Sequence, residues 1–146
     1  MIRRYGEAVV PGQAYTPRPG VYAVLARGFD VLVTHQAEPF NEFQLPGGGI
    51  DPGENPIAAL HREVLEETGW TIHKPQRLGA FRRFTYMPEY DKWAEKVCHI
   101  YVARPALCLG PPRELGHTAF WMPADIAAEK LFGEGDVAFL KDALSF

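Results

Sequence analysis

The sequence has few cysteines, no long apolar run and no excess of basic residues. Of its 146 residues only Cys98 and Cys108 are cysteines, and their spacing fits neither a CxxC motif nor a disulfide framework, so we expect two reduced thiols. No apolar stretch approaches the ~18 residues needed to cross a bilayer, so we expect no membrane span. No apolar segment of the kind found in signal peptides follows Met1-Ile2-Arg3-Arg4. These absences favour a cytoplasmic protein.

The charge balance excludes a broad basic surface. Fifteen Lys and Arg residues stand against 18 Asp and Glu residues, giving a net charge of −3. A nucleic-acid-binding domain usually carries the opposite excess. A nucleotide is not excluded, because bound metal can neutralise its phosphates. The length and the 47% apolar content suit one globular domain over residues 1–146, with the Pro- and Gly-containing residues 1–20 as an extended N-terminal arm.

The stretch from Leu45 to Trp70 concentrates glycine and glutamate. Asn55 is a good helix N-cap, and Pro56 suits the first helical position, where its missing N–H costs nothing. Gly69 stands where a left-handed C-terminal cap is expected. We therefore predict a helix from Pro56 to Thr68.

Glu63, Glu66 and Glu67 fall on one face of this helix, on neighbouring turns. Like charges at these spacings repel, whereas a hard divalent cation would attract all three. A solvated acidic face is the alternative, and it is the commoner origin of such a run. The preceding run Gly47–Gly49 favours the metal reading, because glycine lets the backbone approach a ligand closely.

Gly48, Glu54 and the run REVLEETGW from Arg62 to Trp70 resemble the Nudix box of the Nudix hydrolases. Every fixed position of that motif is matched except the last, where Trp70 replaces the usual bulky aliphatic residue. The resemblance implies an α/β protein with the α/β/α sandwich and mixed sheet of the Nudix fold. It also implies hydrolysis of a phosphoanhydride bond in a nucleoside diphosphate linked to another moiety.

Site roles also follow from the resemblance. It implies that Mg²⁺ or Mn²⁺ is held by the box glutamates and by one backbone carbonyl, namely by Glu63, Glu66, Glu67 and Gly47. Glu54 and Arg62 would form a buried pair that orients the loop and the helix. One of the box glutamates, or a glutamate outside the box, would serve as or orient the general base. Outside the box the first candidate is Glu114, followed by Glu89 and Glu95.

The remaining elements are predicted from apolar runs and turn residues. A hairpin loop is expected at Gly28-Phe29-Asp30, and longer loops at residues 87–95 and 109–117. Strands are expected at Val21–Ala26, Val31–Thr34, Phe43–Leu45, Arg77–Met87, Lys96–Ala103 and Ala119–Met122, and two late helices at Ala124–Leu131 and Val137–Leu144.

The substrate stays open among nucleoside triphosphates, dinucleoside polyphosphates, nucleotide sugars, ADP-ribose and capped RNA. Tyr86 lies near the position of a tyrosine in the dinucleoside polyphosphate branch, and it can instead be a core or rim aromatic. The competing class is a non-catalytic Nudix-fold sensor of nucleotides, which usually lacks box carboxylates and often carries a DNA-binding domain. We expect no DNA-binding domain here. Dimers are common in the family, so the resemblance allows a homodimer.

Overall fold

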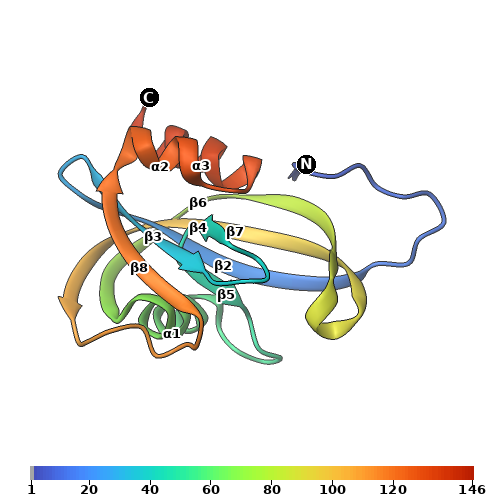
Figure 1. Cartoon of the computed structure of the whole chain (residues 1–146), viewed down its shortest axis with the longest axis horizontal. Helices are drawn as coiled ribbons and strands as arrows, with labels where there is room; N and C mark the ends of the chain where they lie inside the picture. Colours follow the sequence, from blue (N-terminus) through green and yellow to red (C-terminus); the bar gives the residue numbers. More distant parts are fainter. Residues whose placement is uncertain (1) are drawn as a thin grey trace.

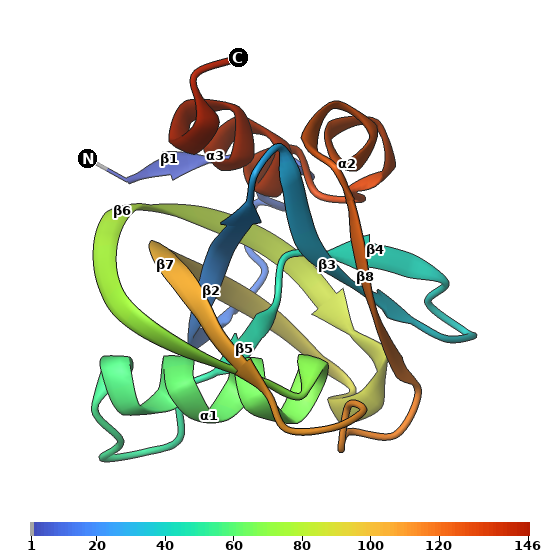
Figure 2. The ribbon, with the colours of Figure 1, turned by 90° about the vertical axis from the view of Figure 1, so that its left-hand side faces the viewer.

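The computed structural model describes residues 2–146, which form three layers (Figure 1). Helix α1 (Pro56–Thr68) lies on one face of a twisted sheet, and α2 (Ala124–Lys130) and α3 (Glu134–Leu144) lie on the other. The view turned by 90° shows the same layering, with α1 separated from α2 and α3 by the strands (Figure 2). The predicted α/β/α sandwich is confirmed. Among these residues, no helix is long and apolar enough to cross a membrane.

The sheet is mixed, as predicted. Its strand order is β1-β6-β7-β2-β3-β4, with β5 beside β2 and β8 beside β3. The β2–β7 and β1–β6 pairs are parallel, whereas β6–β7, β2–β3, β2–β5, β3–β4 and β3–β8 are antiparallel. The strands are β1 (Arg3–Arg4), β2 (Thr16–Arg27), β3 (Asp30–Gln36), β4 (Glu42–Gln44), β5 (Gly47–Gly49), β6 (Trp70–Met87), β7 (Lys92–Cys108) and β8 (His117–Pro123).

Strand β2 runs through the centre of the core. Its side chains alternate between the two faces, so Val21, Ala23 and Leu25 pack toward α1 while Val24 packs toward α2 and α3. On the α1 side they meet Leu60 and other fully buried residues of the helix. Full burial of such a side chain is worth about 1.5–3 kcal/mol, so this packing fixes α1 against the sheet.

Several strands are longer than predicted, and two of these differences shorten the predicted arm and loop. The N-terminal arm was expected to reach residue 20, but β2 begins at Thr16 and pairs with β7 from there. Pro17 and Pro19 are tolerated because their missing N–H groups face away from β7, on the side where the carbonyl of Pro19 accepts from Ile50 N. The loop expected at residues 87–95 is also shorter, with only the 3-10 turn η1 (Pro88–Tyr90) and Asp91 joining β6 to β7.

Helix α1 begins and ends where its capping residues predict. The Asn55 side chain accepts hydrogen bonds from the backbone N–H of Ile57 and Ala58, at 2.9 and 3.3 Å. Gly69 adopts a left-handed conformation with φ 77°, and its N–H donates to the carbonyl of Leu65. These caps fix where α1 starts and stops, and therefore which of its turns carry the glutamates.

Candidate active site

The carboxylates of α1 meet the glycine loop that precedes the helix. Gly47 N donates to Oε1 of Glu67 at 3.1 Å, and the Glu67 side chain is almost fully buried. Gly48 lies against the carboxylate of Glu63 so closely that a Cβ atom there would overlap it. The sequence predicts that the glycine run lets the backbone approach a ligand, and the close contact that the structure shows at Gly48 is with a glutamate of α1.

Arg62 and Glu54 form an ion pair with two hydrogen bonds. Arg62 Nε and Nη2 donate to the two Glu54 carboxylate oxygens, each at 2.8 Å, and Nη2 also donates to the carbonyl of Gly49 at 3.2 Å. Hydrogen bonds from Arg62 lower the pKa of Glu54 to about 2. The expected pairing is present, but it is not fully buried, since the Arg62 side chain is 30% exposed. The pair ties the loop to the helix at the rim of the site.

Glu63 and Glu67 lie in an environment that disfavours their charge. Burial raises the pKa of Glu67 well above its usual value, and the neighbouring carboxylates of Glu114, Glu63 and Glu66 raise it further. Burial likewise raises the pKa of Glu63, although Arg62 donates to it at 2.9 Å. A cation among these oxygens would remove this penalty. The all-oxygen donors Glu63, Glu66 and Glu114 lie within 4.8 Å of one another, which fits the preference of Mg²⁺ and Mn²⁺.

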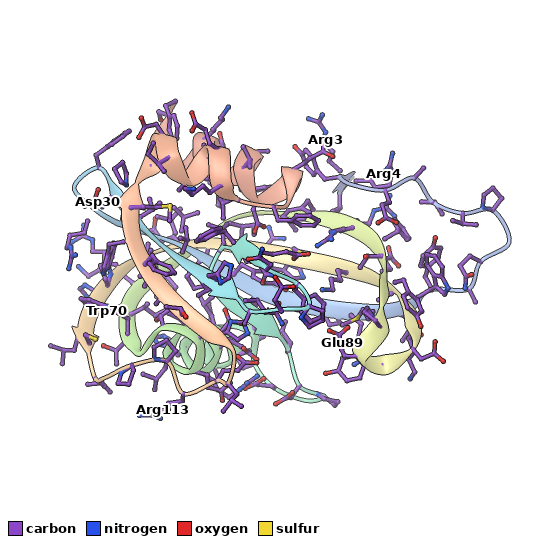
Figure 3. The ribbon with its side chains drawn as sticks, in the orientation of Figure 1. Arg3, Arg4, Asp30, Trp70, Glu89 and Arg113 are labelled. Atoms are coloured by element: carbon purple, nitrogen blue, oxygen red, sulfur yellow. The ribbon has the colours of Figure 1, made fainter. Side chains whose placement is uncertain are left out.

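The loop between β7 and β8 adds two side chains to this cluster. It is fastened to α1 by the backbone N–H groups of Arg113 and Glu114, which donate to the carbonyl of Glu66 at 2.8 and 3.0 Å. Arg113 lies in this loop at the lower edge of the molecule, below α1 (Figure 3). The loop brings Glu114, a predicted residue, and His117, which the sequence analysis missed, against Glu67. The only sequence signal for His117 was its i+3 spacing from Glu114.

Two neighbouring cavities lie near the glycine loop, and the acidic cluster lines one of them. The first, about 390 Å³, runs toward α3 and is lined by Tyr5, Phe81, Phe132, Arg83 and Asp136 among others. The second, about 630 Å³, lies along the glycine loop and is lined by Arg18, Ile50, Met87 and Tyr90 together with Glu63, Glu67 and Glu114. Tyr22 and Lys96 line both cavities, so the first cavity adjoins the one that contains the carboxylates.

A family model described as the NUDIX domain matches residues 16–143. The chain belongs to the NUDIX family. The predicted family resemblance is confirmed, and the match extends from the start of β2 into α3, well beyond the Nudix box.

Relatives of the Nudix domain include proteins with hydrolase names. The chain is 30% identical over 116 residues to an ADP-ribose pyrophosphatase of Bacillus subtilis, covering 76% of this chain and 60% of that protein. It is 36% identical over 91 residues to a CMP-5'-(N-acetyl-N-hydroxy-3-aminopropyl)phosphonate hydrolase of Streptomyces rubellomurinus, covering 61% of this chain and 41% of that protein. The chain thus spans less than two thirds of the length of these curated relatives.

Solved structures show the same fold. A NUDIX hydrolase from Nitrosomonas europaea superposes with a TM-score of 0.74 at 21% identity, covering 89% of this chain and 90% of that one. The Nudix fold predicted from the box is confirmed.

The other predicted site residues of this Nudix domain lie outside the cluster. Tyr86 donates from its hydroxyl to Asp91 and packs on the ring of Trp93, with ring centroids 5.3 Å apart. Glu95 pairs with Arg82 at 3.6 Å, and Glu89 lies in the β6–β7 hairpin, away from α1 (Figure 3). Tyr86 and Glu89 line a third hollow that also contains Glu114 and His117, so the hairpin faces the site across open space.

Asp136 is a half-buried acid in the first cavity, in the first turn of α3. Its Oδ2 accepts from Leu45 N at 3.1 Å, and desolvation raises its pKa to about 6, opposed by that bond and by the charges of Arg83 and Lys96. This pKa exceeds the ordinary aspartate value of 3.8 that is expected on unfolding, so the folded state holds this proton more tightly. The free energy of unfolding should then fall as pH rises through this window.

We expect Asp136→Asn to remove this fall in the free energy of unfolding with rising pH. Between about pH 4 and pH 6 the wild-type protein should lose on the order of 1–3 kcal/mol more stability than the variant, because only the wild type must ionise a half-buried acid. Urea unfolding at pH 4, 5, 6 and 7 measures this difference. Asp142→Asn, at an exposed position of α3, is the matched control and should follow the wild type. Parallel pH profiles for wild type and Asp136→Asn would contradict the prediction.

Proposed function

We propose that the protein is a divalent-metal-dependent hydrolase that cleaves a phosphoanhydride bond in a nucleoside diphosphate linked to another moiety. The observation that carries this proposal is the partly buried set of carboxylates that meets the glycine loop and lines the second cavity. Glu67 is 5% exposed and surrounded by other carboxylates, so its ionised form needs a cation. The hydrolase names of the relatives support the same reaction class.

The residues of the site have different proposed roles in the reaction. Bound Mg²⁺ or Mn²⁺ supplies charge neutralisation for phosphate oxygens and a more acidic water. Glu63, Glu66 and Glu67, with the carbonyl of Gly47, are proposed to hold these ions. Arg62, pinned by Glu54, holds the Glu63 and Glu66 carboxylates in place at 2.9 and 3.3 Å. Glu114, exposed at the mouth of the site, is proposed as the residue that accepts the proton of the attacking water.

The surroundings of the carboxylates support a substrate with groups on both sides of its phosphates. Phe132, an exposed aromatic residue, gives the first cavity an apolar ring on which a base can pack. Lys96 lines both cavities at their junction, where a phosphate chain would cross. Arg18 lies over the ring of Tyr90 at 5.1 Å and lines the second cavity, where it can meet a further phosphate or a second moiety. Tyr86 is proposed to contact the substrate from the hairpin.

The test is release of phosphate, pyrophosphate or nucleoside monophosphate from a nucleotide panel. The panel contains nucleoside triphosphates, diadenosine polyphosphates, ADP-ribose and nucleotide sugars, each with Mg²⁺, Mn²⁺ or chelator. Turnover that needs metal supports the proposal and identifies the substrate class.

Thermal melting distinguishes the proposed hydrolase from the alternative function, a non-catalytic nucleotide sensor. Metal that binds the folded state alone raises the melting temperature in proportion to the logarithm of its concentration. A nucleotide that raises the melting temperature without being cleaved in any metal would favour the sensor. Absence of both turnover and any metal-dependent shift would overturn the metal site itself.

A further inference from the structure

His117 is held against the acidic cluster by backbone pairing. It is the first residue of β8 and pairs with Gln36 of β3, so the sheet fixes its position. Its Nδ1 lies 3.6 Å from Oε2 of Glu67, and its Nε2 lies 3.9 Å from Oε1 of Glu114. The imidazole therefore stands between the buried and the exposed carboxylate.

The imidazole of His117 is buried, and its Nδ1 has no hydrogen-bond partner among residues 2–146. The side chain is only 5% exposed. Both nitrogen–oxygen distances exceed the range of a hydrogen bond. The facing Oε2 of Glu67 is also the oxygen that Gly47 N leaves free, because that N–H donates to Oε1. A buried nitrogen and a carboxylate oxygen without a hydrogen bond therefore face one another across a gap.

An ion fits this gap better than a direct contact does. Ligands bonded to one ion at about 2.1 Å lie roughly 3–4 Å apart. Ligand atoms of Glu67, Glu114 and His117 all lie within 4.8 Å of one another, and those of Glu63, Glu66 and Glu114 form a second such group. Glu114 belongs to both groups, so the two positions are adjacent. A carboxylate that meets an ion through one oxygen keeps its other oxygen for the proton of the attacking water.

We propose that Glu67, Glu114 and His117 form a mixed nitrogen–oxygen metal position beside the all-oxygen position of Glu63, Glu66 and Glu114. Mg²⁺ favours oxygen ligands, whereas imidazole suits transition metals. The position containing His117 therefore selects Mn²⁺ over Mg²⁺. This inference rests on the proposed function, because both positions share the same carboxylates.

The probe is Mn²⁺ alone, added to the whole chain without nucleotide and followed by pulsed electron paramagnetic resonance. Wild-type protein should show ¹⁴N modulation from a coordinated imidazole, and ¹⁵N-histidine labelling should change its frequency. His117→Gln should abolish the modulation and raise the Kd for Mn²⁺ about tenfold or more, with the Kd for Mg²⁺ unchanged. His61→Gln, at an exposed position of α1, is the matched control and should keep both properties.

Two results would contradict the proposal that a nitrogen of His117 coordinates the ion. Bound Mn²⁺ without ¹⁴N modulation in the wild type would show that His117 only forms ion pairs with the carboxylates. Equal weakening of Mg²⁺ and Mn²⁺ in His117→Gln would show a packing role. The labelling experiment uses wild-type protein and shows whether a histidine is coordinated even where the variant does not fold. Among the described residues, His117 is the one histidine in a group of possible metal ligands, and His61→Gln excludes the histidine of α1. In either case the proposed hydrolase stands, whereas absence of any bound Mn²⁺ signal would count against both.

Discussion

Glu66→Gln and Glu67→Gln should each fold and lose at least about a hundredfold in turnover, equivalent to about 2.7 kcal/mol of transition-state stabilisation. Each substitution keeps the size of the side chain and removes one negative charge from the set proposed to hold the ions. The measurement is metal-dependent turnover of whichever panel substrate is cleaved, at saturating Mg²⁺. Glu129→Gln, an exposed change on α2, is the control and should retain wild-type turnover.

The two variants should differ in stability. Burial raises the pKa of Glu67, so its ionised form is a cost in the metal-free protein at pH 7. A glutamine there can still accept from Gly47 N. The metal-free Glu67→Gln protein should therefore melt no lower than the wild type, while losing most of the temperature rise that Mg²⁺ or Mn²⁺ gives. Near wild-type turnover in both variants would contradict the assignment of Glu66 and Glu67 as metal ligands.

Local signals in the sequence predicted the central helix and its charged face. Asn55, Pro56 and Gly69 fix α1 through capping contacts made within a few residues, and the i, i+3, i+4 spacing then puts the glutamates on one face. The Gly47–Gly49 run was predicted to let the backbone approach a ligand closely. The close contacts in the structure are with other parts of the protein, at Gly47 with β2 and at Gly48 with Glu63, whereas Gly49 is open.

These local signals did not predict which strands pair when they lie far apart in the sequence. The strand predicted from Arg77 begins at Trp70 in the structure, where β7 pairs along it with register shifts despite Lys74 and Pro75. Arg3 and Arg4 carry no strand signal and pair with β6 as β1. Such strands are set by their neighbours more than by their own residues.

The outer residues of the site depended on the same long-range pairing. Glu114 was predicted from the family resemblance, and its approach to α1 comes from the bonds of its loop to the carbonyl of Glu66. His117 reaches Glu67 because β8 pairs with β3, and Lys96 lies at the junction of the cavities because β7 lies between β2 and β6. None of these placements follows from spacing along the chain.

Gly48→Val gives the second large expected effect. A Cβ atom at Gly48 would overlap the Glu63 carboxylate, including Oε1 at 2.9 Å. The backbone there is ordinary extended strand, and the overlapped atoms are the end of a flexible side chain, so the protein can fold by turning Glu63 away. That movement separates Glu63 from Arg62 Nη1, now 2.9 Å distant, and removes a proposed ligand. We therefore expect turnover to fall about a hundredfold, as for loss of a metal-binding charge.

Gly49→Val is the matched control for this change. No atom of residues 2–146 lies within 4 Å of a Cβ built at Gly49, and its carbonyl can still accept from Arg62. The two variants differ by one position in the same short strand and add the same side chain. Gly49 lines the second cavity, so the two variants are compared by the rise in melting temperature that Mg²⁺ gives. Gly49→Val should keep this rise and Gly48→Val should lose most of it, because only the change at Gly48 displaces the Glu63 carboxylate. Equal rises in the two variants would show that the fit between loop and helix at Gly48 is not what positions Glu63.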